Sequence, residues 1–307
     1  MRKARTRGLI AAAVLVGGLL GTGGSAAGLT GGAPARPAEL AVTAAAEDCD
    51  LAASLPPKQQ AGAKIAKIRQ RGKLVVGVDQ SAYNWGYRNP QTGKIVGFDI
   101  DLAHAVAKSV LGDPDKVVLK TVSTAHRIDA LKSGEVDLVV RAMTITCERK
   151  KDIAFSVPYF RIAQQAVAPK SAKARSTAEA MKGRRVCAAL NSSSHTELKS
   201  DSRGAAAIVT PDNQLDCLVL MELGEADATL SDSSLAAAMI AQDPTMELVG
   251  QPFQSAYMGV GMNQNDTDLI AWVNQVLADW RSSGGWRASY DTWLRASMGA
   301  APDPYLP

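Results

Sequence analysis

The stretch Gly97-Phe98-Asp99-Ile100-Asp101-Leu102 begins a segment in which apolar residues recur at Val106, Ala107 and Val110. Apolar residues three and four positions apart are typical of a helix with one buried face, so we expect a helix over residues 99–111. The apolar run 95–98 precedes it and follows a turn signal at residues 89–93. The segment therefore predicts a strand that leads directly into a helix.

The same alternation extends in both directions along the chain. Strand-like runs occupy residues 73–78, 116–122, 136–140, 184–190, 206–210 and 226–230, and helix-like runs occupy 125–133, 194–199, 215–223, 233–241 and 269–294, with a break at Gly284-Gly285. Strands of about five residues alternating with helices of about ten favour an α/β fold.

Residues 162–183 separate two comparable blocks, and the apolar stretch 256–262 can return the chain to the first block. The alternation favours parallel sheets, and we expect two lobes connected by two crossovers. Lobe 1 is expected over 61–164 and 255–301, and lobe 2 over 165–254. A cleft between two lobes is a common position for a ligand.

The first residues carry the pattern of an export signal. Among 307 residues with a formal net charge of +4, four cations lie within residues 2–7, followed by the apolar run 9–20 and small residues up to 27. This order predicts a signal peptide over 1–27, with an uncleaved anchor as the alternative. Its removal takes away four cations and lowers the formal net charge to zero. The mature chain therefore lacks the basic excess of a nucleic-acid-binding protein, and no nucleic-acid partner is expected.

Residues 28–60 are rich in Gly, Ala and Pro, which predicts a flexible spacer that includes Cys49. The other cysteines are Cys147, Cys187 and Cys217. An even number in an exported chain indicates two disulfides, for which three pairings are open. Free buried thiols remain an alternative. The absence of a C-x₂₋₄-C spacing argues against a metal site.

Several motifs together resemble one family. Residues 97–110 match a signature of bacterial extracellular solute-binding proteins of family 3, which deliver polar amino acids to ABC importers. The segments 142–151, 155–160 and 226–232 resemble the ligand-binding segment, the motif that follows it and the second-lobe aspartate motif of that family. The resemblance covers about residues 64–295. It implies a two-lobed periplasmic-binding-protein-like fold of type II, in which each lobe is a mixed sheet flanked by helices and a two-strand hinge joins the lobes.

The resemblance also implies how the backbone of an amino acid is held. Arg149 would grip the α-carboxylate with two parallel hydrogen bonds, assisted by the Thr144 amide. Asp232 would bind the ammonium group, with the Ala142 carbonyl and the Thr144 hydroxyl as further acceptors. Asp232 follows a strand in Ser-Asp-Ser-Ser, so it is also a candidate helix N-cap.

A polar turn at residues 191–194 is expected to contribute hydroxyls and free amides to the carboxylate. Its residues Ser192 and Ser193 lie at a strand-to-helix junction, where an anion is stabilised, and a plain helix cap is the alternative. The family often has glycine at the position of Asn191.

Two arginines are candidates for contact with the side chain of the bound amino acid. Arg127 resembles an arginine that faces the distal carboxylate of the ligand in glutamate- and aspartate-binding members. Thr124 is a possible neighbour, and Arg141 is a second candidate for the same role. A buried cation without a partner is costly, which favours an acidic ligand, although pairing with a protein carboxylate is the alternative.

Two aromatic residues complete the expected pocket. Tyr83 and Trp85 follow the first strand, where the family usually supplies a ring over the ligand, and Asp79 at the end of that strand would position polar groups. Similarity to actinobacterial members suggests that Cys187 pairs with Cys217 and Cys49 with Cys147.

The resemblance therefore implies a binding protein for a polar amino acid, and we expect an acidic one, glutamate or aspartate, with asparagine or glutamine next. We expect a monomer without cofactor or catalytic activity, exported to the cell envelope or medium, and associated with the membrane through an ABC permease or an uncleaved signal. Two alternatives are a sensor domain that signals through a membrane partner and a dehydratase on the same fold.

Overall fold

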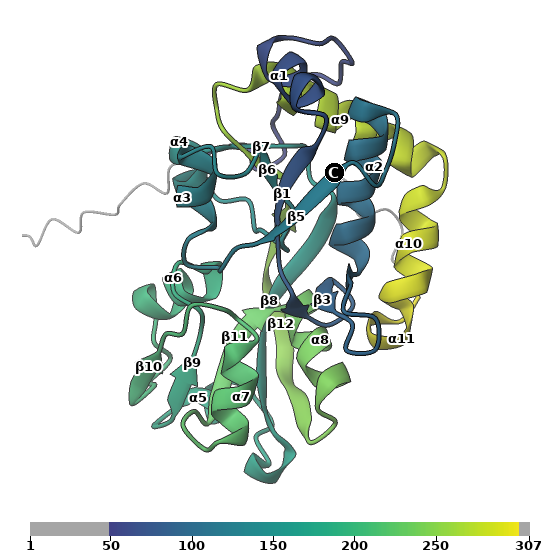
Figure 1. Cartoon of the computed structure of the whole chain (residues 1–307). Helices are drawn as coiled ribbons and strands as arrows, with labels where there is room; N and C mark the ends of the chain where they lie inside the picture. The colour runs from purple at the N-terminus through teal and green to yellow at the C-terminus, as the bar shows by residue number, and fades with distance from the viewer. Residues whose placement is uncertain (1–48, 301–307) are drawn as a thin grey trace, which may run out of the picture. The chain divides into compact units, whose positions relative to one another are not determined.

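The first of two five-stranded sheets forms the centre of lobe 1. The computed structural model describes residues 49–300 (Figure 1). The strand order is β5-β1-β6-β13-β7, in which β1 is parallel to β5 and β6, and β13 is antiparallel to β6 and β7. The bounds are Leu74–Val78 for β1, Val117–Thr121 for β5, Leu138–Val139 for β6, Ala154–Phe155 for β7 and Gly261–Met262 for β13.

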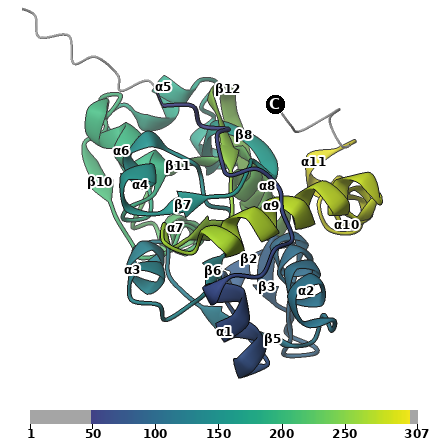
Figure 2. The same cartoon turned by 90° about the horizontal axis from the view of Figure 1, so that it is seen from above.

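Helices cover this sheet, and the expected helix over 99–111 is confirmed as α2. The helices of lobe 1 are α1 (Ala63–Arg71), α2 (Phe98–Leu111), α3 (Arg127–Lys132), α4 (Cys147–Asp152), α9 (Thr267–Ser282), α10 (Gly285–Trp293) and α11 (Arg295–Met298). Helix α9 packs on both α1 and α2 (Figure 2). A small sheet of β2 (Ser81–Ala82), β3 (Gly86–Arg88) and β4 (Ile95–Val96) precedes α2.

The start of α2 depends on a glycine. Gly97 has φ of 137°, and a Cβ there would lie 2.4 Å from the carbonyl oxygen of Trp85. Only glycine fits this close approach at a left-handed φ, so the chain passes from β4 into the helix in one residue. Phe98, which we expected to end the strand, opens the helix instead.

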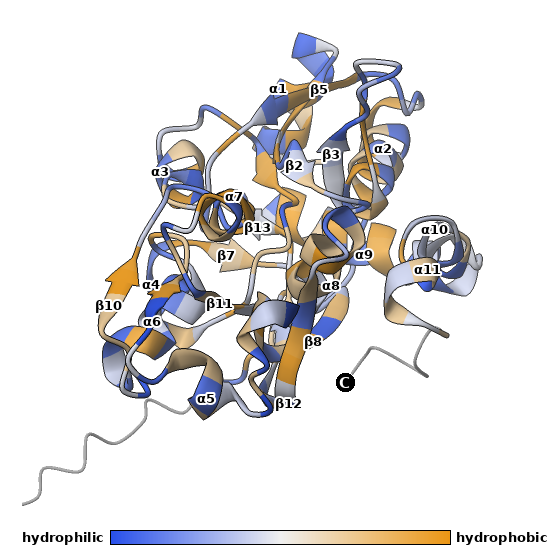
Figure 3. Cartoon of the chain, turned by 90° about the horizontal axis from the view of Figure 1, so that it is seen from below, coloured by the Kyte–Doolittle hydropathy of each residue, from blue (hydrophilic) through white to orange (hydrophobic). Residues whose placement is uncertain are grey.

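Lobe 2 is built on the second five-stranded sheet, of order β10-β9-β11-β8-β12. Its strands are β8 (Phe160–Pro169), β9 (Arg185–Cys187), β10 (Ala207–Val209), β11 (Ala228–Asp232) and β12 (Met246–Met258). Its helices are α5 (Thr177–Met181), α6 (Ser193–Ser200), α7 (Asp216–Glu222) and α8 (Ser233–Gln242), with a short 3₁₀ turn at Lys170–Ala172. Figure 3 shows β10 as strongly hydrophobic, whereas helices such as α5 carry both characters, which suits helices that bury one face.

Two long antiparallel strands join the lobes, as expected for a two-strand hinge. Strands β8 and β12 pair from Phe160 with Met258 to Pro169 with Met246, and their register shifts between residues 249 and 256. The amide of Gln165 donates to the carbonyls of Val249 and Gly250, at 3.0 and 3.1 Å, and so supports the irregular stretch. The segment 162–183, expected as a separator, is therefore a hinge strand in its first part.

The N-terminal part of the described chain corrects the expectation of a flexible spacer up to residue 60. Cys49 is bonded to Cys147, and the Lys150 ammonium donates to the carbonyls of Asp50 and Ala53, at 2.6 and 2.8 Å. The Asn274 amide donates to Leu55 at 2.6 Å. These contacts fix residues 49–55 to lobe 1. The expected signal peptide and residues 28–48 lie outside the described residues.

None of the helices in this part of the chain has the length and apolar character that crossing a bilayer requires.

Candidate ligand-binding site

A small cavity of about 20 Å³ lies where the two lobes meet. Lobe 1 contributes residues that follow its strands, and lobe 2 contributes residues around the starts of α6 and α8. The lining residues are Thr124, Arg127, Arg141, Ala142, Thr144, Ser192, Ser193, Ser194, Gln214, Ser231, Asp232 and Leu235. The structure therefore brings together eight of the twelve residues expected from sequence: Thr124, Arg127, Arg141, Ala142, Thr144, Ser192, Ser193 and Asp232.

Arg127 is a buried cation without an ion pair in the described chain. Only 4% of the residue is exposed, its Nη1 donates to the carbonyl of Arg141 at 3.5 Å, and its Nε has no hydrogen-bond partner. Burial, followed by the charges of Arg149 and Arg141, lowers the pKa of Arg127 well below its usual range, and Asp232 and Asp79 oppose that shift. An anion in the cavity would relieve this unfavourable state.

Arg141 lies in the same cavity, but its charge is already compensated. Its guanidinium forms an ion pair with Asp79 at 2.8 Å, and its Nε donates to the carbonyl of Val122 at 2.7 Å. Its other donors reach the Thr124 hydroxyl at 2.6 Å and the Asn213 side chain in lobe 2 at 3.1 Å. Because these partners occupy its donors, Arg141 is a weaker candidate than Arg127 for a distal carboxylate. Asp79 positions Arg141, and it does not itself line the cavity.

Asp232 combines the two roles considered for it from sequence. Its Oδ1 accepts from the amides of Ser234 and Leu235, each at 3.0 Å, and from the Ser234 hydroxyl, so it caps α8. The carboxyl group also faces the cavity. Burial raises the pKa of Asp232, and the hydrogen bonds and Arg127 lower it. A ligand ammonium would stabilise the charged form.

The polar turn before α6 adopts a conformation that asparagine tolerates. Asn191 has φ of 61°, in the left-handed region that asparagine adopts more often than most other non-glycine residues. Ser192 caps α6 by accepting from the His195 amide at 3.0 Å, and Ser193 lies 3.1 Å from the Thr144 hydroxyl across the interlobe boundary. The turn therefore keeps its cap and still presents hydroxyls to the cavity.

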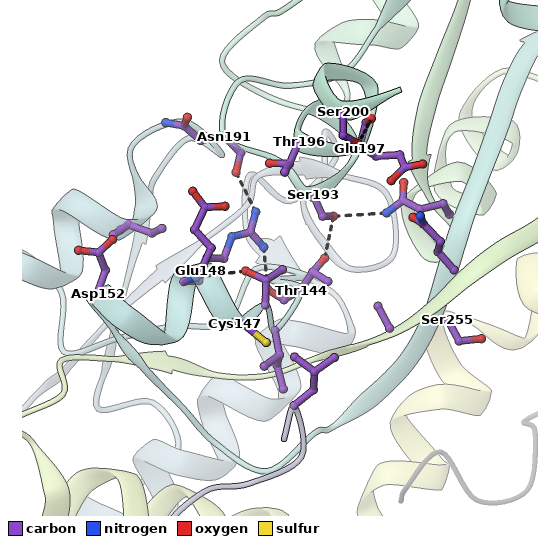
Figure 4. Close-up of a pocket in the computed structure, with 18 residues that line it drawn as sticks. Thr144, Cys147, Glu148, Asp152, Asn191, Ser193, Thr196, Glu197, Ser200 and Ser255 are labelled. Atoms are coloured by element: carbon purple, nitrogen blue, oxygen red, sulfur yellow. Dashed lines mark hydrogen bonds between the residues drawn. The ribbon is translucent and has the colours of Figure 1, made fainter. Parts of the chain in front are cut away.

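Arg149 lines an adjoining pocket of about 460 Å³. Figure 4 shows this pocket, with Thr144 and Ser193 near each other and Asn191 at its edge. Arg149 donates through Nη1 to the Thr144 carbonyl at 2.6 Å and through Nη2 to the Asn191 carbonyl at 2.8 Å. Burial lowers its pKa to about 10. Thr144 and Ser193 line both spaces, so the guanidinium stands at the boundary between them.

The expected aromatic lid needs correction. Trp85 is almost fully buried and packs edge-on against Phe98 and Phe160, with ring centroids 5.4 and 4.8 Å apart. Its large apolar ring belongs to the core of lobe 1. Tyr83 packs against Tyr87 at 4.9 Å and lines a separate pocket beside α8. Neither ring faces the cavity.

The suggested cysteine pairing is the one that the structure contains. Cys187 is bonded to Cys217 within lobe 2, and Cys49 to Cys147 at the start of α4. The second bond lies two residues before Arg149. Among residues 49–300, the structure offers no group of three or more His, Cys, Asp or Glu side chains that could hold a metal ion.

Four residues that line the cavity were not expected from the sequence: Ser194, Gln214, Ser231 and Leu235. Ser194 and Ser231 adjoin expected residues in motifs that were recognised, and the buried Ser231 hydroxyl has no hydrogen-bond partner. Gln214 joins the loops of lobe 2 by accepting from the Ala189 amide at 3.0 Å, and no sequence signal marks it. Asp99 lies outside the cavity and binds the Ala142 amide at 2.7 Å, a contact 43 positions away.

Proteins of similar sequence include two that are named for glutamine binding. The glutamine-binding protein GlnH of Bacillus subtilis is 31% identical over 231 residues, which cover 75% of this chain and 84% of that protein. The glutamine-binding protein of Geobacillus stearothermophilus is 36% identical over 197 residues, or 64% of this chain and 75% of that protein. Other relatives are named for L-cystine or for glutamate and aspartate.

Solved structures share the fold. A mutant of ArgBP from T. maritima has a TM-score of 0.70 at 30% identity, covering 75% of this chain and 99% of that one. An ancestral amino-acid-binding protein, described as a precursor of cyclohexadienyl dehydratase, has a TM-score of 0.68 at 31% identity, with the same coverages. The expected type II periplasmic-binding-protein fold is thus confirmed.

The family follows from the match over most of the chain. The family model "Bacterial extracellular solute-binding proteins, family 3" matches residues 74–296, a range that includes every residue lining the interlobe cavity. Members of this family bind small solutes outside the cytoplasm. The chain belongs to the bacterial extracellular solute-binding proteins of family 3.

Proposed function

We propose that this protein binds an acidic amino acid, glutamate or aspartate, between its lobes and delivers it to an ABC importer. The observation that carries the proposal is the buried, unpaired guanidinium of Arg127 in the interlobe cavity. A charged group that is buried without a counter-ion is strongly unfavourable, so the ligand that brings a matching anion gains most.

The charges around the cavity support a ligand of net charge −1. Arg141 and Asp79 compensate each other as an ion pair. Asp232 then matches the ammonium of an amino acid and Arg149 its α-carboxylate, which leaves Arg127 for a second carboxylate. Glutamate and aspartate carry these three charges, whereas glutamine and asparagine would leave Arg127 unpaired.

Binding at Arg149 requires an exchange of partners. Its Nη atoms donate to the carbonyls of Thr144 and Asn191, one from each lobe. A carboxylate is a stronger acceptor for a guanidinium than a neutral carbonyl, because both partners are charged. The ligand would thus replace one or both carbonyls at Arg149 while the neighbouring Thr144 and Ser193 hydroxyls stay within reach.

Isothermal titration calorimetry with Arg127→Gln tests the proposal. We expect the affinity for glutamate to fall roughly 10- to 100-fold, the size of a lost charge-assisted hydrogen bond, while the affinity for glutamine changes little. Arg287→Gln is the matched control, because Arg287 is exposed on α10. An equal loss for both ligands, or no loss for glutamate, would contradict the assignment of Arg127.

The transport role rests on the family and on the names of its members. Relatives named as amino-acid-binding proteins support a non-enzymatic role for this chain. Lobe closure on the ligand would present a distinct surface to a permease, provided that the closed form binds the ligand better than the open form. We propose that the protein acts outside the cytoplasm as a monomer and is retained near the membrane by its importer.

A further inference from the structure

Two aspartates of the segment that opens α2 make different connections. Asp101 accepts from the Ser289 hydroxyl at 2.7 Å and from the Trp293 indole at 2.8 Å, and so ties α2 to α10. Asp99 accepts from the Tyr159 hydroxyl at 2.9 Å and from the Ala142 amide at 2.7 Å. Only Asp99 therefore connects α2 to the segment that lines the cavity.

The peptide unit between Arg141 and Ala142 joins Asp99 to Arg127. Its N–H points to Asp99, and its carbonyl accepts from the Arg127 Nη1 at 3.5 Å. A trans peptide is planar with its N–H and C=O on opposite sides, so fixing one end aims the other. The carbonyl of this unit is the one hydrogen-bond acceptor of Arg127 that residues 49–300 provide.

The backbone at this unit needs an external support. Ala142 has φ of 42°, a left-handed value that a residue with a Cβ adopts only when its surroundings hold it there. The hydrogen bond from its amide to a buried carboxylate is charge-assisted, and such bonds are roughly twice as strong as neutral ones. Asp99 therefore stabilises the backbone at a residue whose φ is unfavourable.

We propose that Asp99 is a positioning residue that sets the ligand selectivity of the cavity by orienting the Arg141–Ala142 peptide toward Arg127. The proposal rests on the proposed function, because Arg127 is the group assigned to the distal carboxylate.

Asp99→Asn tests the proposal with little change of shape. The asparagine oxygen can accept from Ala142 and its amide can donate to Tyr159, so the contacts persist while the charge is lost. At pH 8 we expect the calorimetric preference for glutamate over glutamine to fall roughly three- to thirtyfold, the range of residues that act without touching a ligand. The matched control Asp101→Asn should leave that preference unchanged.

A second measurement needs no ligand. The side-chain Nε–H resonance of Arg127, assigned by its loss in Arg127→Lys, should shift in Asp99→Asn and stay in place in Asp101→Asn.

Equal effects of the two aspartate variants on the preference, or an unmoved Arg127 resonance, would overturn the role of Asp99. If the wild type prefers glutamine, the proposed function fails, and the change of preference in Asp99→Asn still decides the inference. If it binds neither amino acid, the resonance alone decides.

Discussion

At the scale of single residues, the interlobe cavity holds its charges in three different states. Arg141 is paired with Asp79 at 2.8 Å, Asp232 is stabilised by the amides that it caps, and Arg127 has neither kind of support. The same residue type therefore serves as a structural cross-link at one position and as an available cation at another. The partners of each guanidinium separate the two roles.

Asp232 allows the cap and the ligand contact to be separated by mutation. Asp232→Asn keeps an oxygen that can cap α8 but loses the charge for a ligand ammonium. We expect it to weaken binding of glutamate and glutamine alike, roughly 10- to 100-fold, with nearly unchanged unfolding. Asp232→Ala should in addition lower the free energy of unfolding by about 1 kcal/mol, the value of a helix cap. Calorimetry and urea denaturation of both variants check this, and a ligand-specific loss in Asp232→Asn would contradict it.

Asp99 should make stability depend on pH. Burial raises its pKa to about 7, partly opposed by its hydrogen bonds from Ala142 and Tyr159. The unfolded chain ionises this group near pH 3.9, so the folded state alone holds the proton between about pH 4 and 7. The resulting stabilisation is complete below about pH 4 and is lost as the pH rises through about 7.

The measurement is the free energy of unfolding of the wild type relative to Asp99→Asn. We expect this difference to fall by about 2–3 kcal/mol between pH 5 and pH 8, because the asparagine does not titrate. Urea denaturation at several pH values gives the difference. A flat difference over this range would mean that Asp99 is already ionised at pH 5.

At the scale of elements, α4 and the segment before it carry three of the proposed binding residues, Ala142, Thr144 and Arg149, and the Cys49–Cys147 bond ties this region to the N-terminal segment. The bond closes a separation of 98 residues. Removing it with Cys49→Ser and Cys147→Ser should cost about 4–5 kcal/mol on the chain-entropy estimate. We also expect weaker binding of every amino acid, because Cys147 lies two residues before Arg149.

The Cys187–Cys217 bond is the matched control for that experiment. It closes a separation of 30 residues within lobe 2, so its removal should cost about 3–4 kcal/mol. It is not next to Arg149. We therefore expect its loss to change the affinity less than the loss of the Cys49–Cys147 bond does. Affinity that is unchanged without Cys49–Cys147 would show that the bond supports the fold and not the binding segment.

Sequence predicts elements and motif residues well, because both depend on short-range patterns. The helix over 99–111 follows from the spacing of its apolar residues. Ala142, Thr144, Arg149 and Asp232 follow from motifs that resemble those of the family. Trp85 was misassigned because a ring after a strand can point to the cavity or the core, and only packing against Phe98 and Phe160 decides. Asp99 was missed because its partner is 43 positions away.

At the scale of the whole described chain, hydrogen bonds between the lobes surround the cavity. Arg141 reaches Asn213 at 3.1 Å, and the Asn191 amide reaches the Ala125 carbonyl at 3.0 Å. These bonds do not involve a ligand directly. They would therefore stabilise closure for every ligand equally, whereas the role proposed for Arg127 is to distinguish between ligands.

Asn213→Ala should accordingly lower the affinity for all ligands by a similar factor. We expect a roughly two- to tenfold loss for both glutamate and glutamine, the value of one hydrogen bond, with their ratio unchanged. Asn265→Ala is the matched control, because that side chain is exposed and lies between β13 and α9 of lobe 1. Calorimetry with both ligands measures the two factors, and a changed ratio would show that Asn213 acts on selectivity.

The most direct test of an acidic ligand is competitive calorimetry of the wild type with glutamate and glutamine at pH 8. These ligands differ in the charge that Arg127 would meet and have nearly the same shape. We expect glutamate to bind at least about tenfold more tightly, the effect of pairing a buried cation. Glutamine binding as tightly as glutamate, or more tightly, would contradict the assignment of the cavity to an acidic amino acid.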